Sequence, residues 1–354
     1  MDTITHALSG ALLARATART NDGFSMNRRT WIGALVASLP DIDFVLLSFD
    51  SMTYLTWHRG PTHSLVLLPL WTLLLAKLIY VMFHKQLPFW SLVTVCGACL
   101  GVHIVGDLIT AYGTRIFFPL SDLRATLSTT FIIDLLFTGI LILGLIVSRI
   151  WQPQRSASAA LAVLALYVAM QSYWHREASS LARTFARHSE FTGYELFALP
   201  QPLSPLNWKL VVVNNDVYYE AYVRLHGTGN PFLARGRLAD IGNIYRTPSD
   251  LNWTRTWRFG KSYYDNQLAR QAWERKEFEG FRKFAVLPAL LGIEHHGSQE
   301  CVWFTDLRFV IGDRVPPFRY GLCRQFNGRN WHLERLKSSI LQQLPSLKQQ
   351  TGQT

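Results

Sequence analysis

Histidine and aspartate residues interrupt the otherwise apolar N-terminal half of this 354-residue chain. Imidazole and carboxylate groups together form a ligand set that suits zinc, manganese or iron. Ionisable side chains at membrane depth are costly unless they face one another, water or a bound ion. The pattern therefore predicts a divalent metal site, of one to three ions, in a membrane-embedded helical domain. The candidate ligands are His6, Asp41, Asp43, His58, His63, His103, Asp107 and Asp134.

Two short spacings favour shared binding of one ion. His103 and Asp107 are four residues apart, so on a helix they would project from the same face. They could both bind the ion, or the carboxylate could orient the imidazole, and Gly106 between them would allow close approach. Asp41 and Asp43 alternate in a predicted turn, from which both could reach an ion.

The segment around His58 and His63 has a different character. The two histidines cannot share a regular helix, because Gly60-Pro61 interrupts it. Thr62 is expected to cap the following helix, which would place His63 in its first turn. Exposed N–H groups there favour an anion such as phosphate, and Arg59 could bind that anion in a bidentate manner.

Each of these residues taken alone is more often a helix cap or a buried hydrogen-bonding group than a ligand. His6 has no local support from spacing and by itself is more often a packed or capping histidine. As a set, unpaired ionisable groups in lipid-like segments would cost several kcal/mol each without partners. A non-catalytic metal-stabilised scaffold and an ion or proton transporter remain alternatives, although no internal repeat typical of transporters is present.

The elements that must position these groups are apolar. Residues 3–19 read as a helix whose small residues would allow close helix packing. Trp31–Phe49 is apolar but interrupted by Pro40 and the aspartates, which favours a half-buried or re-entrant segment. Further stretches approach the ~20 residues needed to cross a bilayer. They are Leu65–Phe83, Phe89–Ile109, Phe131–Ile150 and Ala157–Trp174.

Helix topology brings several candidates to one membrane side. If Leu65–Phe83 and Phe89–Ile109 are antiparallel, then His58, His63 and Asp107 lie at the same end, and Asp134 begins the next span there. Orientation stays open. Lys85, Arg149 and Arg155 favour a cytoplasmic location for the other end, whereas Arg115 and Arg124 argue against it.

Composition divides the chain. Residues 1–174 contain no glutamate and carry eight aspartates against eleven Lys or Arg, whereas the remainder has sixteen acids and twenty-four bases. We therefore expect an all-α transmembrane helical domain followed by a mainly β (α+β) soluble domain. The predicted boundaries are 1–175 for the membrane domain, 176–190 for a linker and 191–354 for the extramembrane domain.

The C-terminal half reads as short strands and turns. Trp208–Val213 and Val217–Leu225 are separated by a hairpin signal, Asn214-Asn215-Asp216. Ser262–Phe284 reads as a helix, Cys301–Ile311 and Phe318–Phe326 as strands, and Trp331–Leu344 as a closing amphipathic helix.

The cysteines fall into two pairs. Cys96 and Cys99 lie in an apolar run and are expected to pack between helices. Cys301 and Cys323 could form a disulfide if their domain is extracytoplasmic, but the sequence leaves that pairing open.

The positive charge does not indicate a nucleic-acid binder. The pI is near 9.7, but the bases are dispersed and no helix-turn-helix, zinc-finger or RNA-binding motif occurs. Positive charge beside anionic lipid headgroups explains the composition better. The predicted partners are therefore the lipid bilayer and a lipid-linked substrate, with no nucleic acid and an unknown oligomeric state.

Ordered motifs resemble the YdjM-type family of bacterial inner-membrane proteins, regarded as membrane-bound metal-dependent hydrolases. The resemblance covers roughly residues 1–150, and the C-terminal half is similar to the extra domain of longer members. The motifs are Met-Asp-Thr-Ile-Thr-His-Ala-Leu-Ser-Gly (1–10), Leu-Pro-Asp-Ile-Asp (39–43), His-Arg-Gly-Pro-Thr-His-Ser (58–64), His-Ile-Val-Gly-Asp-Leu-Ile-Thr-Ala-Tyr-Gly-Thr (103–114) and Phe-Ile-Ile-Asp (131–134).

The resemblance implies that all eight candidate ligands, His6 included, form the metal centre of a multi-pass protein of the bacterial inner membrane. The expected function is hydrolysis of a phosphoester in a lipid or lipid-linked substrate, with zinc as the first choice of metal. Asp43 or Asp107 would orient the attacking water, and Arg59 would neutralise developing charge.

Overall fold

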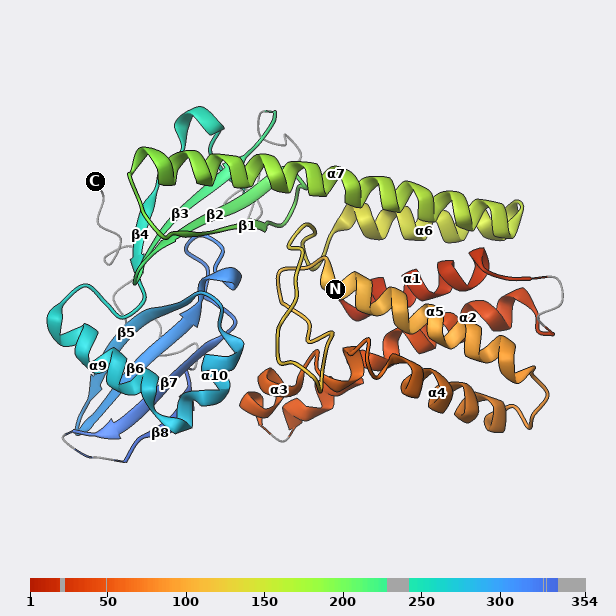
Figure 1. Cartoon of the computed structure of the whole chain (residues 1–354), viewed down its shortest axis with the longest axis horizontal. Coiled ribbons are helices and arrows are strands. Elements are labelled where there is room, and N and C mark those ends of the chain that lie inside the picture. The colour runs from red at the N-terminus through yellow and green to blue at the C-terminus, as the bar shows by residue number, and fades with distance from the viewer. Residues whose placement is uncertain (20–22, 49, 228–241, 327, 329, 337–354) are drawn as a thin grey trace. The chain divides into compact units, whose positions relative to one another are not determined.

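The computed structural model describes residues 1–19, 23–48, 50–227, 242–326, 328 and 330–336. Within them the chain forms two compact units, one built mainly by Met1–Tyr173 and one by the chain from Trp174 onward. The first unit is helical and the second contains two antiparallel sheets (Figure 1). The expected fold class, a helical N-terminal region followed by a mainly β (α+β) region, is confirmed.

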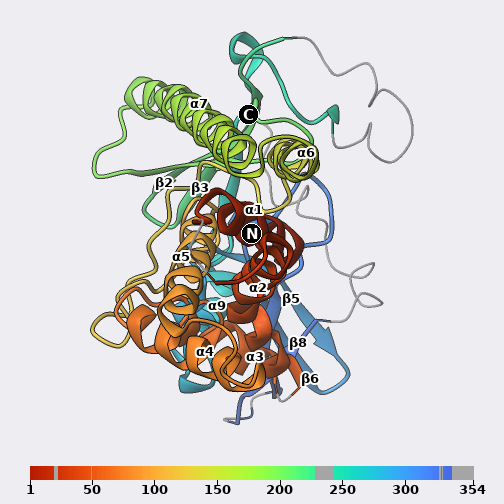
Figure 2. The same cartoon turned by 90° about the vertical axis from the view of Figure 1, so that its right-hand side faces the viewer.

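Two helices organise the first unit. Helix α1 (Thr3–Ala16) packs against α2 (Met26–Ser38), α5 (Phe89–Leu108) and α6 (Leu135–Ile150). Helix α5 also packs against α2 and α4 (Leu68–Met82), and Figure 2 shows this group of helices from one end. Helix α1, which carries His6, and helix α5, which carries His103 and Asp107, are therefore direct neighbours.

Small residues allow α1 and α2 to approach closely, as the sequence predicts. A Cβ atom built on Gly10 would lie 2.3 Å from the carbonyl oxygen of Gly33 and 2.4 Å from the Cβ of Ala37. A Cβ on Gly33 would lie 2.5 Å from the Cβ of Ala14. Since real Cβ atoms are not found at such distances, only glycine fits at this crossing.

The chain between α2 and α4 is irregular. Helix α2 passes directly into the 3₁₀ helix η1 (Leu39–Ser48), and a short helix α3 (Ser51–Trp57) and a 3₁₀ turn η2 (Pro61–His63) follow. The segment Ser51–His63 is bent by 81° from α4. The expected interruption at Pro40 is therefore not a bend: Met26–Ser48 forms one continuous segment that changes from α to 3₁₀ geometry, and the sharp bend comes later, before α4.

The prediction that Thr62 caps the helix after His63 is wrong. Helix α4 begins only at Leu68, without a side-chain cap, and His63 ends η2. The hydroxyl of Ser64 instead accepts hydrogen bonds from the backbone N–H groups of residues 66 and 67. The hydroxyl of Thr62 hydrogen-bonds to Nδ1 of His63 and so holds that ring.

Helix α7 (Pro153–His188) is longer than the sequence predicts. Residues 176–190 were expected to be a linker, but most of them continue this helix. The physical reason is burial: Ala178, Ala182 and Ala186 recur at helical spacing and pack in a core with Trp208.

The first sheet of the C-terminal unit has the strand order β1-β2-β3-β4, all antiparallel. The predicted hairpin is present, because Asn214 pairs with Val217 and Asn215 adopts a positive φ of 56°. The bounds are β1 (Glu195–Pro200), β2 (Asn207–Asn214), β3 (Val217–Arg224) and β4 (Thr254–Trp257).

The second sheet has the order β5-β6-β7-β8 and is also antiparallel. The predicted single helix over Ser262–Phe284 is divided into helices α9 and α10 by a short 3₁₀ turn, η5. The bounds are α9 (Tyr263–Glu274), η5 (Lys276–Phe278), α10 (Glu279–Phe284), β5 (Pro288–His296), β6 (Gln299–Asp306), β7 (Arg319–Gln325) and β8 (His332–Arg335).

The predicted closing helix Trp331–Leu344 is wrong where the structure describes it. Residues 332–335 form the strand β8, because they extend the sheet through pairing with β7. Residues 337–344 lie outside the described residues. Cys301 and Cys323, whose pairing the sequence left open, form a disulfide between β6 and β7.

A buried lysine ties the first sheet to the segment after β6. Nζ of Lys209 lies 2.7 Å from a carboxylate oxygen of Glu220 and donates to the carbonyl of Leu307 at 2.8 Å. Burial lowers the pKa of this amine, but Glu220 and Tyr222 together raise it by more, so the pKa lies above its ordinary value. The amine is therefore charged and fully engaged in holding the unit together.

Candidate functional site

Seven of the eight candidate ligands, all except Asp134, come together at the end of α5 where Asp107 lies. His6 comes from α1, the two aspartates of the Pro-Asp-Ile-Asp motif come from η1, and His103 and Asp107 come from α5. The connection between α3 and α4 supplies the other two histidines. All these side chains are buried, and those described in this cluster are His6, Asp41, Asp43, His58, Arg59, His63, His103 and Asp107.

Asp107 is the centre of the cluster. Its Oδ1 lies 3.1 Å from Nε2 of His6 and 2.8 Å from Nη2 of Arg59, and it also contacts the amino group of Met1. Its Oδ2 lies 3.1 Å from Nε2 of His63 and 3.6 Å from Nε2 of His103. One carboxylate therefore joins residues from α1, α5 and the α3–α4 connection.

Backbone contact fixes the orientation of His103. Its Nδ1 lies 2.6 Å from the carbonyl oxygen of Ala37, which can only accept, so Nδ1 carries the proton and Nε2 presents a lone pair. That Nε2 lies 2.9 Å from Nε2 of His63. Two imidazole nitrogens at this distance need a shared proton or a cation, and a backbone-anchored imidazole is typical of metal ligands.

Asp41 completes the donor group. Its Oδ1 lies 3.8 Å from Nε2 of His63 and 3.7 Å from Nε2 of His103, and its Oδ2 accepts a hydrogen bond from Thr3 at 2.8 Å. His6, Asp41, His103 and Asp107 each offer a ligand atom, and these atoms all lie within 4.8 Å of one another. This buried group could hold a metal ion.

Unpaired atoms support that fit. Within the described chain, Nδ1 of His6 and Oδ2 of Asp107 are buried and have no hydrogen-bond partner, although Oδ2 lies close to two imidazoles. Buried polar groups in proteins nearly always find partners. These two unpaired atoms, an imidazole nitrogen and a carboxylate oxygen, lie beside other potential metal ligands. A bound cation would give such atoms a partner.

Glycine at position 106 explains how His6 reaches the cluster. A Cβ atom at Gly106 would lie 3.1 Å from Cε1 of His6. The His6 ring also stacks on His103, with ring centroids 3.7 Å apart. The expectation that Gly106 allows close approach is met, and the approaching group is His6.

Asp43 and His58 form a second, adjoining pair. Nδ1 of His58 lies 2.8 Å from Oδ1 of Asp43, and the backbone N–H of Arg59 donates to Oδ2 at 3.3 Å. The His58 ring stacks on Tyr54 at 4.5 Å and meets His63 edge-on at 5.9 Å. The pair lies beside the four-residue group and is slightly more exposed than it.

The guanidinium of Arg59 is bound by other side chains of the protein. It contacts Asp107 and donates to the hydroxyl of Thr110 at 2.9 Å, and its carbon Cζ lies 4.6 Å from the ring centroid of Tyr112. The sequence suggested that Arg59 grips an anionic ligand. The structure instead pairs this guanidinium with the central carboxylate.

Asp134 is not part of the cluster in the described structure. Its Oδ1 caps α6 through the N–H groups of Leu136 and Phe137, and its Oδ2 accepts from Tyr167 at 2.8 Å and Gln171 at 2.7 Å. Both oxygens therefore have partners. Topology placed this aspartate at the correct end of the helices, but its carboxylate is needed to start α6 and hold α7.

Some contributors have no signal in the sequence. Thr3 supports Asp41, the carbonyl of Ala37 orients His103, and Thr110 holds Arg59. A threonine three residues after Asp107 is consistent with a position beside the helix end, but no pattern identifies a backbone carbonyl as a partner.

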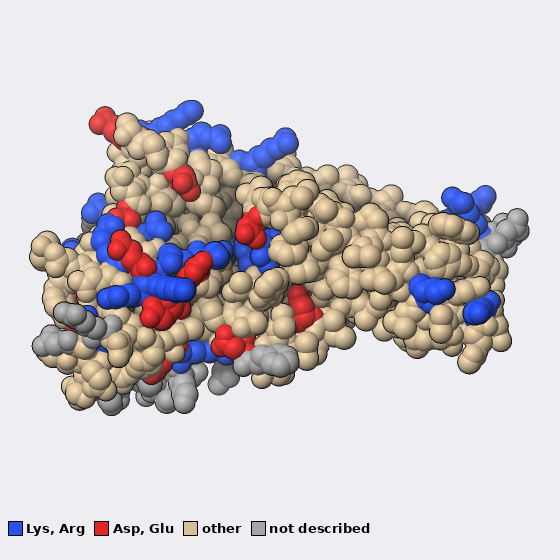
Figure 3. Space-filling model, turned by 60° about the horizontal axis from the view of Figure 1, so that its bottom comes forward, with Lys and Arg blue, Asp and Glu red and all other residues tan. Residues whose placement is uncertain are grey.

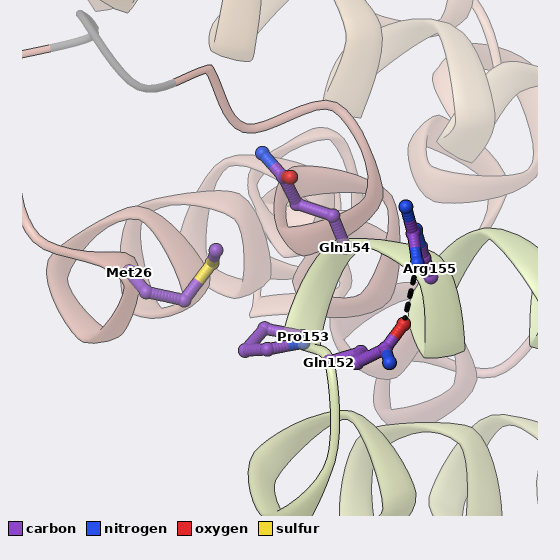
Figure 4. Close-up of a pocket in the computed structure, with 5 residues that line it drawn as sticks. All are labelled: Met26, Gln152, Pro153, Gln154 and Arg155. Atoms are coloured by element: carbon purple, nitrogen blue, oxygen red, sulfur yellow. Dashed lines mark hydrogen bonds between the residues drawn. The ribbon is translucent and has the colours of Figure 1, made fainter.

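A separate pocket lies elsewhere. It is lined by Met26 and by residues 152–155 at the start of α7, and Figure 4 shows Arg155 donating to Gln152 at 3.1 Å. The lining residues from α7 are exposed, and none of the candidate ligands belongs to this pocket. It does not contribute to the site.

Several helices are long and apolar. Within the part of the chain that the structure describes, three segments could cross a membrane by length and composition: Met26–Ser48, Phe89–Leu108 and Pro153–His188. The bent pair Ser51–His63 and Leu68–Met82 would raise the number to four. Figure 3 shows the visible face of the helical unit largely free of charged side chains, with Lys and Arg gathered at one end. Fold and site together define a helical membrane protein with a buried group that could hold a metal ion.

The chain belongs to the YdjM inner membrane protein family, whose model matches residues 1–178. It is 29% identical over 183 residues to the uncharacterized protein YfhP of Bacillus subtilis (strain 168). That alignment covers 49% of this chain and 53% of YfhP, so the chain spans about half the length of this curated relative. No solved structure matches the chain.

Proposed function

We propose that this protein is a multi-pass, membrane-embedded, metal-dependent hydrolase that acts on a phosphoester of a lipid or lipid-linked substrate. The observation that carries the proposal is the buried group of His6, Asp41, His103 and Asp107, whose ligand atoms lie within 4.8 Å of one another. His63, between Asp41 and Asp107, is a further ligand. Zinc suits these nitrogen and oxygen donors best, with manganese and iron as alternatives and one to three ions in all.

The remaining residues suit hydrolysis. A divalent cation, when bound, would polarise a phosphoryl oxygen and make water a better nucleophile near neutral pH. Asp43 is the candidate to orient and deprotonate the attacking water, because its carboxylate is held by His58 and lies beside the ligand group. Arg59 fixes Asp107 and offsets the negative charge of the carboxylates.

The surroundings favour an amphiphilic substrate. Asp41 and Asp43 are buried, but Ile42 and Phe44 between and after them are 57% and 62% exposed. Trp57, immediately before His58, is also exposed. Exposed apolar side chains beside the most accessible ligands would contact acyl chains rather than water, which supports a lipid over a soluble phosphoester.

Metal content tests the proposal first. We expect detergent-purified wild-type protein to retain one or more ions per chain in mass spectrometry and to release phosphate from lipid phosphoesters. His63→Ala and His103→Ala should lose both metal and activity. His84→Ala, at an exposed turn after α4, is the matched control and should keep both.

Three results would contradict parts of this assignment. Absence of metal under metal-replete conditions, or full metal and activity in His63→Ala, would remove the metal centre. Retained metal without any phosphoester hydrolysis would favour the metal-stabilised scaffold.

The role of Asp43 as the general base can be tested separately. The Asp43→Asn variant should keep the metal and lose about 10²–10⁴-fold in activity, the usual contribution of general base catalysis.

A further inference from the structure

The second sheet carries a row of metal-binding residue types unrelated to the helical site. Cys301 on β6 lies directly opposite Cys323 on β7, and Cys323 lies directly opposite His332 on β8. Directly opposite residues of antiparallel strands point to the same face, as do residues two apart on one strand. Glu334 therefore joins this row on the same face as His332.

The row lies on the face of the sheet away from the aromatic core. Phe304 and Tyr320 pack on the rings of α9, η5 and α10. Because side chains alternate along a strand, Cys301 and Cys323 point to the opposite face. There they form a small cluster with residues that include Trp303 and Leu336.

One end of the row is open to solvent. The two cysteines are buried, whereas the side chains of His332 and Glu334 are 54% and 43% exposed. These last two lie on β8, the edge strand of the sheet, with Nε2 of His332 2.9 Å from Oε1 of Glu334. An ion could therefore approach the row from this edge.

The donor atoms are close enough to share an ion. One ligand atom each of Cys323, His332 and Glu334 lie within 4.8 Å of one another, and Sγ of Cys301 is bonded to Sγ of Cys323. Two thiolates, an imidazole and a carboxylate form a tetrahedral set of the kind that zinc prefers. A disulfide sulfur lacks the negative charge of a thiolate and is a poor ligand for zinc.

We propose that this sheet binds a zinc-class divalent cation through Cys301, Cys323, His332 and Glu334 when its disulfide is reduced, and loses that site when the disulfide forms. A dithiol supplies two electrons and two protons, so the protein disulfide becomes two thiols while the dithiol becomes a disulfide. Each thiol then releases its proton as its sulfur binds the cation. The site is independent of the proposed hydrolase activity.

Cobalt(II) is a suitable probe, because thiolate ligands give it a charge-transfer absorption that histidine and carboxylate ligands do not. The full-length protein in detergent is reduced with dithiothreitol, freed of the reagent without oxygen, and titrated with Co²⁺. We expect the absorption in the reduced protein and its absence in the oxidised protein. Cys301→Ser/Cys323→Ser should lack it, and His332→Ala should weaken Co²⁺ binding by about tenfold or more.

Two controls make the result decisive. Cys96→Ala/Cys99→Ala removes the other cysteine pair, which is buried between helices, and should keep the absorption. His295→Ala changes an exposed histidine of the same sheet and should also keep it. The proposal is overturned if reduced wild-type protein shows no thiolate absorption, if the absorption survives loss of Cys301 and Cys323, or if it disappears with Cys96 and Cys99.

Discussion

Asp107 shows how one buried carboxylate can organise a site. Its two oxygens contact His6, His63 and Arg59 at 2.8–3.1 Å, and His103 lies 3.6 Å away. Several kcal/mol would oppose burial of a single carboxylate without such partners. The guanidinium of Arg59 and the amino group of Met1, which both contact Asp107, offset part of the charge contributed by Asp107, Asp41 and the neighbouring Asp43, and a cation would offset more of it.

Substitution of Asp134 should lower the stability of the fold, whereas substitution of the cluster residues should remove the metal. Asp134→Ala removes the cap of α6 and the acceptor of Tyr167 and Gln171. We expect a loss of roughly 1–2 kcal/mol from the cap alone, with more from the two buried donors left unpaired. Thermal denaturation in detergent measures the loss.

Metal content separates the two roles of Asp134. Because its carboxylate lies outside the cluster, folded Asp134→Ala protein should keep the metal content of the wild type, whereas His103→Ala should not. A folded Asp134→Ala variant without metal would restore this aspartate to the ligand set.

At the scale of elements, the site depends on how closely three helices approach. Helices α1, α2 and α5 contact one another, and each brings a part of the cluster: His6 from α1, Ala37 from α2 and His103 from α5. Gly10 and Gly33 set the distance between α1 and α2. In lipid, such close packing of small residues is a main source of helix association.

A larger residue at this crossing should disturb both fold and site. Gly10→Leu would place its side chain against the backbone of Gly33, and overpacking costs about 1–3 kcal/mol or more. We expect a lower melting temperature and reduced metal content. Gly139→Leu on α6 is the matched control, since a Cβ there meets nothing within 4 Å, and it should change neither. Equal losses of melting temperature and metal content in the two variants would show that close packing at Gly10 does not control the site.

At the scale of the whole molecule, the distribution of basic residues along the helical unit favours one membrane orientation. The connections α1–α2, α4–α5 and α6–α7 lie at the end of the helical unit opposite the cluster (Figure 1). Lys85 lies in one of them, and Arg28, Arg149 and Arg155 lie in the adjoining turns of α2, α6 and α7. On the site side lie the two opposing charges, Arg115 and Arg124, whose guanidinium groups donate to the backbone carbonyls of Thr56 and Leu55.

We therefore expect the basic turns in the cytoplasm and the site on the opposite side. In a Cys96→Ala/Cys99→Ala background, Ser121→Cys should react with a membrane-impermeant maleimide in spheroplasts, and Gln86→Cys should react only after lysis. The reverse pattern would invert the topology.

Composition and residue spacing predict the division into two units, the apolar helices and most of the residues that gather in the cluster. These features follow from composition and period, which act locally: apolar runs near bilayer length form helices, and His103 and Asp107 share a face because they are four apart. Family resemblance added His6, which spacing could not support.

The packing of the helices in three dimensions selects which carboxylates face the histidines and which group Arg59 binds. Those outcomes depend on distances between helices, set by Gly10, Gly33 and Gly106, and on competition for each carboxylate. Asp134 lies at the predicted end of the bundle, yet the free N–H groups of α6 and the donors of α7 take its oxygens. Strand β8 likewise formed where a helix was expected, because an edge of the sheet supplies hydrogen bonds that local pattern does not reveal.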